Sequence, residues 1–480
     1  MMIRHSLLYL PAQIVGPFMQ LVAMVVWTHL VNEHSLGIIT LVIAIHELLQ
    51  IGCLAWWSQY ALRFYGRFQG AEDKDRFHRT ENVILTLSIL VQSVVATIIL
   101  IGVVAPDANK TLIVATVAYV MTRAVSLYIS ERARISHQIG IYSAQQIIGP
   151  AAGFVIGWAL IKLVDAAPEW VLAGYAAAQL LAVVVVLPAL QYGRSFRPID
   201  RDIFKQALQY GVPLLIGGSL GWLGLNAPRF IVNDLIGVAA AGLFAVGYGL
   251  GQRAAAVAAM LVTAAAYPIA VKSMEEKGST AAMQQLADNG ALLLAVLIPT
   301  SVGVFVLRHD IVTIMIAESF RATTLAILPL SVAAGGIRSI RAHFCDQVFL
   351  LHSRTRLSAL ISATEAAAAV IIGIAGTLLW GILGAAVASV AATLTAAILS
   401  FSIGFVRFRL IVPFVHLIRI SIAAMVMAAA LTVITPARDL LSLILHIALG
   451  GCIYAAVLAL CYAPWLVRKF TTRSDLTPAE

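Results

Sequence analysis

Two arginines spaced three residues apart, Arg338 and Arg341, stand inside a long apolar stretch of the sequence. On a helix this spacing places both side chains on one face. An arginine left in lipid costs roughly 2.5 to 3.5 kcal/mol, so each needs a wet or charged environment. The guanidinium fork can bond two oxygens of one anionic group. The pair therefore predicts either an anion-binding lining, extension to the membrane surface, or pairing with Glu47, Asp346 or Glu365.

Three further arginines, Arg123, Arg253 and Arg419, also fall within apolar stretches. Arg419 lies near the start of its stretch and is expected to reach the membrane surface. We assign Arg123 and Arg253 to the same cationic lining as the first pair, where Gly335 on the shared face is expected to leave room. Five arginines against three carboxylates in these stretches favour an anionic cargo. Any of the three carboxylates could instead couple transport to a proton or a sodium ion.

Other polar side chains in apolar stretches are further candidates for contact with a cargo. Arg229 lies near the end of its stretch and could hold an anionic group or pair with a nearby carboxylate. Gln13 and Gln20 share one stripe of the first predicted helix, and His46 and Gln50 share one stripe of the second. These stripes could contact hydroxyl groups of the cargo or act as polar links between helices.

The composition requires a membrane to hold these residues. Of 480 residues, 61% are hydrophobic and 11% charged, with a mean hydropathy of +0.93, whereas soluble domains carry about a quarter charged residues. At about 20 residues per crossing, the apolar runs predict an all-α polytopic membrane protein of about fourteen transmembrane helices. The expected spans cover, approximately, residues 5 to 31, 36 to 62, 82 to 105, 111 to 130, 142 to 164, 169 to 190, 208 to 230, 237 to 262, 286 to 307, 322 to 346, 356 to 379, 383 to 405, 415 to 435 and 440 to 465.

The loops between these spans alternate in charge. One class holds 21 of the lysines and arginines and the other holds 6, which places the first class and both termini in the cytoplasm. This bias accounts for the net charge of +9 without nucleic acid. The segment from 63 to 81 is expected as a solvated cytoplasmic turn. All loops are too short for a catalytic or nucleotide-binding domain, no phosphate-binding glycine loop occurs, and the four cysteines lack metal-ligand spacing. We therefore expect a transporter without a catalytic site, metal or other cofactor.

The first and seventh predicted helices resemble each other. Residues 8 to 11 (LYLP) correspond to 209 to 213 (QYGVP), an offset of about 200 residues, and both helices contain helix-breaking residues. Matching breaks in two halves are expected in gating helices, although close helix packing would also use glycines. The repeat predicts an N-terminal lobe at 1–200, a C-terminal lobe at 201–405, and two appended helices with a tail at 406–480. The gating candidates are Pro11, Pro17, Pro213, Gly217, Gly221 and Pro228.

Several short motifs give the sequence a family resemblance. They are residues 6 to 11 (SLLYLP), 28 to 31 (THLV), 36 to 37 (LG), 63 to 65 (RFY), 229 to 231 (RFI), 242 to 244 (GLF) and 346 to 347 (DQ). With the spacing of the spans, they make the chain resemble a polysaccharide flippase of the multidrug, oligosaccharidyl-lipid and polysaccharide exporter superfamily. The resemblance implies two six-helix lobes around a central cavity and alternating access for an undecaprenyl-diphosphate-linked saccharide.

The resemblance also implies where the protein works and with what partners. It implies the bacterial inner membrane and, as partners, the lipid-linked saccharide, membrane lipids, and a glycan polymerase with its chain-length machinery. The diphosphate would bind the cationic lining. A multidrug or cation antiporter of the same superfamily is the alternative, but a cationic drug would favour a cavity rich in carboxylates. A membrane-embedded glycan-modifying enzyme is the third hypothesis, and it would need an acid, a base and a nucleophile that converge.

Overall fold

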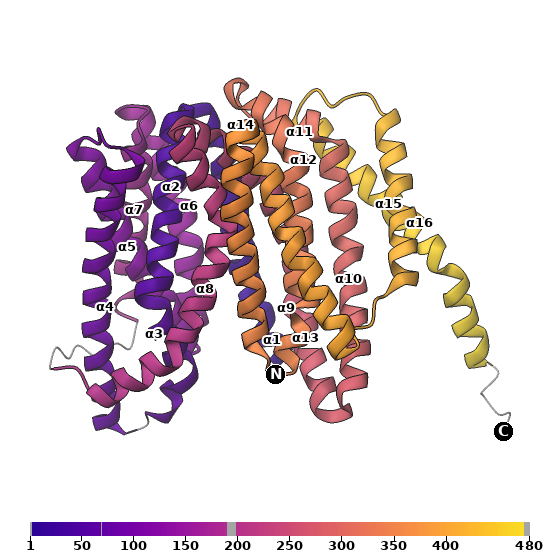
Figure 1. Ribbon diagram of the computed structural model, residues 1–480, viewed down its shortest axis with the longest axis horizontal. Helices are drawn as coiled ribbons and strands as arrows, with labels where there is room; N and C mark the ends of the chain where they lie inside the picture. Colours follow the sequence, from indigo (N-terminus) through magenta and orange to yellow (C-terminus); the bar gives the residue numbers. More distant parts are fainter. Residues whose placement is uncertain (1, 69, 190–197, 475–480) are drawn as a thin grey trace. The chain divides into compact units, whose positions relative to one another are not determined.

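The computed structural model describes the backbone of residues 2–68, 70–189 and 198–474, and side chains from 15 to 463 except at 17, 69, 190–197, 261 and 263–265. Every regular element in these residues is helical, as predicted (Figure 1). The α-helices are α1 (Met2–Leu30), α2 (Glu33–Gln50), α3 (Trp56–Phe64), α4 (Ala71–Ile99), α5 (Lys110–Ile135), α6 (Ile139–Leu163), α7 (Pro168–Val186), α8 (Arg201–Leu235), α9 (Val238–Lys277), α10 (Ser279–Val306), α11 (Arg308–Met315), α12 (Glu318–Ile340), α13 (Gln347–Leu351), α14 (Thr355–Phe408), α15 (Phe414–Val433) and α16 (Leu440–Ser474). Three π-helical turns, Ile51–Ala55, Leu100–Val104 and Arg341–Cys345, interrupt them.

The outer surface of the helices is apolar. In the described residues, ten helical segments are long and apolar enough to cross a membrane. Large apolar side chains are exposed, such as Leu379 of α14 at 70% and Val433 of α15 at 87%. Contact with water would make such a surface unfavourable, whereas lipid chains accept it. The chain is therefore an all-helical, multi-pass membrane protein.

The chain packs into two compact units. Unit 1 comprises Met1–Val246 and Ala366–Ala388, and unit 2 comprises Gly247–Glu365 and Ser389–Glu480. Within unit 1, α7 packs against α5 and α6, and α4 packs against α5 (Figure 1). Within unit 2, α10 packs against α12 and α15, and α15 packs against α16. Helices α9 and α14 contribute residues to both units.

Short polar sequences begin several of the helices. The Asn32 side chain accepts a hydrogen bond from the Ser35 amide at 2.8 Å at the start of α2, and Asn109 accepts one from the Leu112 amide at 2.7 Å at the start of α5. Pro168 is the first residue of α7, where its missing amide hydrogen costs nothing. These caps satisfy backbone groups at the turns where the sequence predicts breaks between spans.

Helix α14 is two helices joined by a tight bend. The backbone leaves the helical region at Trp380 and Gly381, and Gly381 has a φ of 58°, which glycine adopts readily. The two arms cross closely, because a Cβ atom on Gly384 would lie 1.8 Å from the carbonyl oxygen of Gly376. The bend coincides with the break that the sequence predicts between residues 379 and 383.

Helices α2 and α9 approach each other through two glycines of unit 1. A Cβ atom on Gly37 would lie 2.0 Å from the Val238 carbonyl oxygen, and one on Gly242 would lie 2.1 Å from the Glu33 carbonyl oxygen. Backbone atoms cannot move aside as side-chain ends can. We therefore expect Gly37→Ala and Gly242→Ala each to destabilise the protein by about 1 to 3 kcal/mol, measured as thermal unfolding of the purified protein in detergent.

Gly221→Ala is the matched control for these two variants. Gly221 also lies within a helix, but in the described part of the chain no heavy atom lies within 4 Å of its Cβ position. Alanine there should leave stability unchanged or raise it by up to about 1 kcal/mol, because alanine favours the helix. Equal losses in all three variants would contradict the close backbone approach.

Asp200 links the start of α8 to α4 by hydrogen bonds. Its carboxylate accepts hydrogen bonds from the amides of Asp202 and Ile203 at 3.1 Å, and from Arg76 Nε at 2.7 Å. Its own amide donates to the Thr80 hydroxyl at 3.1 Å. Partial burial raises the pKa of the Asp200 carboxyl, but the hydrogen bonds from Arg76 and the two amides outweigh burial and hold the pKa below its usual value.

A carboxyl whose pKa is lowered by folding stabilises the protein above its unfolded pKa and loses that contribution as the pH falls through the folded pKa. We expect Asp200→Asn to lower stability by about 0.5 to 1 kcal/mol at neutral pH, since asparagine keeps the cap but not the ion pair. Thermal unfolding across a pH series should show the difference from wild type shrinking below about pH 4. A difference that does not depend on pH would contradict the role of the ion pair.

Candidate functional site

Two arginines bind one buried carboxylate in unit 2. Arg338 of α12 donates to Glu365 Oε1 from Nη2 at 2.7 Å and from Nε at 3.1 Å. Arg341, at the start of the following π-helical turn, places Nη1 at 2.8 Å from Glu365 Oε2. Each guanidinium group therefore binds a different oxygen of the Glu365 carboxylate. With Asp346, these residues form what we call the arginine cluster.

Asp346 is the second carboxylate of the arginine cluster. Its Oδ2 lies 3.6 Å from Arg341 Nε, and its Oδ1 accepts a hydrogen bond from the Ser400 hydroxyl at 2.5 Å. Asp346 N also donates to the Arg341 carbonyl oxygen at 2.8 Å, five residues back, which is the bond that defines the π-helical turn. Such turns often mark functional sites within helices. The turn brings Asp346 back beside the residue that begins it.

Polar groups from α9 and α14 surround the arginine cluster. The Thr393 hydroxyl donates to Glu365 Oε1 at 3.3 Å, and Arg338 Nη1 donates to Gln252 Oε1 at 3.5 Å. These contacts hold the carboxylate and the guanidinium in fixed positions. The residues that supply these contacts all belong to unit 2.

The arginine cluster is buried and balanced in charge. The exposed fraction of the side chain is 2% for Glu365, 8% for Arg341, 15% for Asp346 and 18% for Arg338. Two guanidinium groups therefore face two carboxylates. The sequence left open whether these arginines line an anion site, extend to the membrane surface or pair with carboxylates. In the structure they pair with Glu365 and Asp346. Whether the pair also binds a cargo stays a prediction.

Gly335 does not leave room beside the guanidinium groups. A Cβ atom there would lie 3.0 Å from the Ala255 Cβ and 3.2 Å from the Gln252 Cα, both in α9. The expected space is wrong, because α9 packs directly against this glycine.

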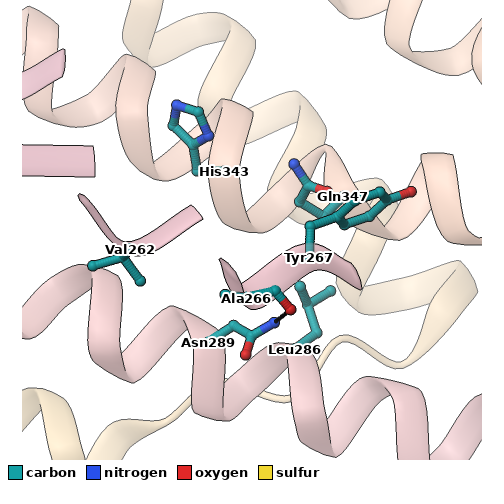
Figure 2. A pocket seen from close by; sticks show the side chains of 7 residues that line it. All are labelled: Val262, Ala266, Tyr267, Leu286, Asn289, His343 and Gln347. Atoms are coloured by element: carbon teal, nitrogen blue, oxygen red, sulfur yellow. Dashed lines mark hydrogen bonds between the residues drawn. The ribbon is translucent and has the colours of Figure 1, made fainter. Parts of the chain in front are cut away.

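A small pocket is lined in part by residues of the π-helical turn and of α13 (Figure 2). His343 and Gln347 reach it from the turn and from α13, while Tyr267 of α9 and Asn289 of α10 line it from neighbouring helices. Asn289 donates to the Ala266 carbonyl at 2.8 Å, and among the described residues the buried Gln347 Oε1 atom has no hydrogen-bond partner. The turn that begins at Arg341 therefore also supplies a side chain to a small, mainly apolar pocket.

A second buried ion network lies in unit 1, and the sequence analysis missed it. Glu81 of α4 is fully buried, and its Oε1 lies 3.1 Å from Arg132 Nε of α5, whose side chain is 1% exposed. The Tyr128 hydroxyl also donates to Oε1, and His78 Nδ1 lies 2.8 Å from Oε2. We call these four residues the glutamate network.

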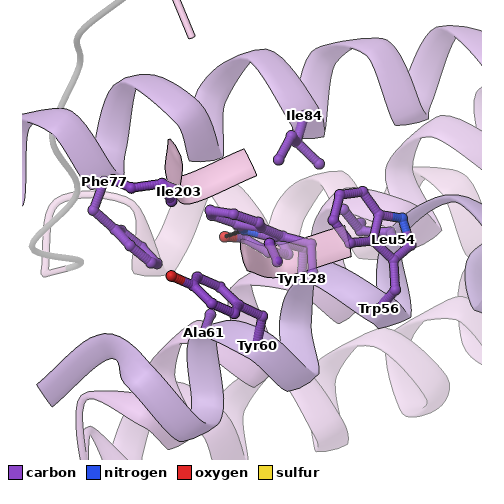
Figure 3. Close-up of a cluster of buried hydrophobic side chains, with 10 residues drawn as sticks. Leu54, Trp56, Tyr60, Ala61, Phe77, Ile84, Tyr128 and Ile203 are labelled. Atoms are coloured by element: carbon purple, nitrogen blue, oxygen red, sulfur yellow. Dashed lines mark hydrogen bonds between the residues drawn. The ribbon is translucent and has the colours of Figure 1, made fainter. Parts of the chain in front are cut away.

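Tyr128 of the glutamate network also belongs to a cluster of buried aromatic and aliphatic side chains (Figure 3). Trp57 is fully buried, donates to the Tyr128 hydroxyl at 3.1 Å, and has its ring centroid 5.2 Å from that of Phe77. The Arg132 guanidinium lies 3.9 Å from the centre of the Tyr65 ring. Arginine over an aromatic face is stabilised in this way, most strongly where water is excluded. The network is therefore part of the core of unit 1.

The expected solvated turn from 63 to 81 is wrong for its second half. Helix α4 begins at Ala71, eleven residues before the predicted start of the third span. Phe77, Glu81 and Ile84 recur at helical spacing and are all buried. That spacing was the signal available in the sequence, and the surrounding charges concealed it.

His46, Glu47 and Gln50 of α2 lie in different environments. His46 is 2% exposed, and its ring lies 5.8 Å from the Tyr119 ring of α5 in an edge-to-face arrangement. Gln50 is half-buried with Oε1 unpartnered, whereas Glu47 is exposed. Arg123 follows Tyr119 by one turn and is half-buried. The predicted stripe thus faces α5 in part, and its contact with a cargo stays a prediction.

The remaining cargo candidates of unit 1 are scattered. Arg229 Nη1 donates to the Thr40 carbonyl oxygen at 3.4 Å, which links α8 to α2. Gln20 is exposed on α1, and the side chain of Gln13 lies outside the described residues.

Two arginines of unit 2 lie outside the arginine cluster. Arg253 is half-buried on α9. Arg419 of α15 lies over the ring of Tyr462 of α16, 4.8 Å from its centre.

The gating candidates fall mostly on α8. Pro213 is exposed, Pro228 is buried, and the helix assignment continues through both. Among the described atoms, none lies within 4 Å of a Cβ position on Gly217, as for Gly221, so close packing does not explain these glycines. The side chains of Pro11 and Pro17 lie outside the described residues. A gating role stays a prediction.

Comparison with known proteins defines the class. The fold is similar to a solved structure described as "Lipid II flippase MurJ, inward closed conformation", with a TM-score of 0.75 and 13% identity over 97% of this chain and 100% of that one. It is also similar to an outward-facing multidrug resistance MATE family transporter (TM-score 0.53, 14% identity, 85% and 95% covered). A MOP superfamily transporter from Pyrococcus furiosus gives a TM-score of 0.51 at 16% identity, with the same coverage. The chain thus has the fold of the MOP superfamily transporters.

One part of the chain also matches a known family by sequence. Residues 169–325 match a family model described as "Polysaccharide biosynthesis protein". No curated protein matches the chain. The predicted resemblance to polysaccharide exporters of this superfamily is thereby confirmed.

Proposed function

We propose that this protein is a flippase that moves an undecaprenyl-diphosphate-linked oligosaccharide from the cytoplasmic to the periplasmic leaflet of the bacterial inner membrane by alternating access. The observation that carries the proposal is the arginine cluster, in which two guanidinium groups meet on the two oxygens of one carboxylate. A phosphate group presents oxygens that the same two forks can bind. The family match and the likeness to a structure described as a lipid II flippase support it.

The proposed architecture has fourteen crossings with both termini in the cytoplasm. The ten apolar segments count α14 once, although it bends at Gly381, and α1, α8 and α9 are the further helices of sufficient length. Two six-helix lobes, at 1–200 and 201–405, with two appended helices remain the proposed organisation.

Transport on this scale needs an energy source and partners. Glu47, Asp346 and Glu365 remain the proposed sites for a coupling proton or sodium ion. The lipid-linked saccharide and membrane lipids are the proposed ligands, and a glycan polymerase with chain-length machinery would receive the product.

A multidrug or cation antiporter is the second candidate, because solved MATE transporters share the fold. The arginine cluster argues against a cationic cargo, because both of its carboxylates are already paired with arginines. Membrane-embedded glycan modification is the third candidate, and we rank it last because the solved structures that share the fold are described as a flippase and as transporters.

Reconstitution in liposomes tests the proposal. The purified protein should make a fluorescent lipid-diphosphate saccharide in the inner leaflet accessible to a reagent outside, with a dependence on the amount of protein. Efflux of cationic dyes from the same vesicles should match that of empty liposomes. Dye efflux without movement of the lipid would favour the antiporter and reject the flippase.

A further inference from the structure

The Glu365 carboxylate binds the guanidinium groups of Arg338 and Arg341 in the way that an anionic ligand would. Arg338 binds Oε1 and Arg341 binds Oε2, at 2.7 and 2.8 Å. A carboxylate and a phosphate offer oxygens to arginine in similar geometry. As long as Glu365 is ionised and in place, the donors that face it cannot serve another anion.

We propose that Glu365 is the resting occupant of the arginine pair, and that an anionic lipid headgroup displaces it as Glu365 takes up a proton. This inference rests on the proposed function, because it assigns the headgroup to the same two arginines. It names Glu365 as the residue that links headgroup binding to proton binding.

Charge balance makes the proton necessary. The two arginines are already neutralised by Glu365 and Asp346. A diphosphate diester carries a negative charge on each phosphate, so its arrival would leave excess negative charge in a buried site. Unpaired buried charge is costly. A proton on Glu365 removes one negative charge and weakens its hold on both guanidinium groups at once.

The surroundings single out Glu365 as the carboxylate that links the two binding events. From α12 and the π-helical turn it faces the two arginines, with Asp346 beyond them. From α14 it faces the Thr393 hydroxyl, and from α9 the Tyr248 hydroxyl lies close to Arg338. Asp346 contacts one arginine and has the Ser400 hydroxyl as a second partner, so its release would free less of the pair.

The headgroup has a direction of approach. Arg338 keeps 18% of its side chain exposed, whereas Glu365 keeps 2%. Arg338 is therefore the more accessible of the two residues before the carboxylate leaves. Binding would begin there and continue to Arg341 after the exchange.

Linkage between the two events is reciprocal. If a proton on Glu365 favours the headgroup, then the headgroup must favour the proton by the same factor. Two consequences can be measured: affinity for the headgroup should rise as the pH falls, and binding should take up protons from the buffer.

The test uses the full-length protein in lipid nanodiscs and farnesyl methyl diphosphate, a lipid diphosphate diester whose own charge is constant near neutral pH. Isothermal titration calorimetry from about pH 6 to about pH 8 should show wild-type affinity falling with pH. Glu365→Gln should bind about tenfold tighter than wild type at the upper end and show no slope, since it cannot hold the arginines with a full charge. Asp288→Asn, an exposed carboxylate of α10 in the same unit, should behave as wild type.

The outcomes separate this inference from the proposed function. If wild type binds the probe, Arg338→Gln/Arg341→Gln/Glu365→Gln does not, and Glu365→Gln keeps the wild-type affinity and slope, then the exchange is wrong while the arginine site stands. If the triple variant binds as wild type does, the arginines do not hold the headgroup, and both proposals for this site are overturned.

Proton uptake tests the exchange without any substitution. Binding enthalpies of the wild-type protein, measured in two buffers of different ionisation enthalpy, should differ in the direction of net proton uptake. No difference between buffers would overturn the inference. A slower rate of lipid movement in Glu365→Gln, despite tighter binding, would support it, because the returning carboxylate is what releases the headgroup.

Discussion

Replacement of both Arg338 and Arg341 by alanine is expected to abolish export of saccharide to the cell surface. In the proposed complex each arginine would donate charge-assisted hydrogen bonds to the headgroup that alanine cannot replace, and a hydrogen bond of this kind contributes about 1.5 to 3 kcal/mol. Losing both should lower export by about 100-fold or more. Surface polymer, measured with antibody or lectin at matched protein levels, gives the result.

Folding must be separated from binding in this experiment. The alanine variant leaves Glu365, with 2% of its side chain exposed, without its ionic partners, and an unpaired buried charge can cost about 3 to 5 kcal/mol. The matched variant Arg338→Gln/Arg341→Gln/Glu365→Gln removes the charge at Glu365 and keeps similar side-chain volumes, while Asp346, which is 15% exposed, keeps its hydrogen bond from Ser400. It should fold and insert in the membrane but still fail to export. Normal export by this triple variant would reject the assigned role of the arginines.

The second large effect is expected on stability, from the glutamate network of unit 1. Arg132→Ala should destabilise the protein by about 3 to 5 kcal/mol, because it leaves Glu81 fully buried without its guanidinium partner. The same change removes the stacking of Arg132 on Tyr65. Thermal unfolding of the purified protein, and its yield in the membrane, should both report the loss.

Arg134→Ala provides the comparison on the same helix. Arg134 pairs with Glu131 at 2.6 Å, which is closer than the Arg132 pair, but their side chains are 39% and 32% exposed. Solvent-exposed pairs contribute about 0 to 1 kcal/mol. If the two variants unfold at the same temperature, burial is not what gives the Arg132 pair its strength.

The pairing of charges shows where sequence reasoning reaches its limit. Arg338 and Arg341 stood out because charge within an apolar run is expensive, and Glu365 was already a candidate partner. Glu81 and Arg132 also form a buried ion pair in the structure. In the sequence, however, they lie at the ends of predicted spans, where charged residues are common. The local pattern could not distinguish a charge at a helix end that faces solvent from one that faces another helix.

The helix with most of the predicted gating residues, α8, shows the same limit. Pro213 and Pro228 mark α8 as unusual in the sequence, yet the helix assignment is continuous through both. In contrast, the bend at Gly381 could be located from the sequence. The apolar run around it is long enough for two spans, so a short turn must separate them. A proline indicates that a backbone hydrogen-bond donor is missing, but the neighbouring groups decide whether the helix breaks, bends or continues.

The sequence by itself determined that the chain is all-helical, crosses a membrane many times, and carries two arginines on one helix face. These properties depend on the length and periodicity of apolar runs, which are local. Only the tertiary structure decided that Glu365, 24 residues beyond Arg341, closes the arginine pair, and that Glu81 binds Arg132 across two helices. The physical reason is that a buried charge is stabilised by an opposite charge within about 3 Å. The packing of the helices decides which residue that is, and spacing along the chain does not encode this packing.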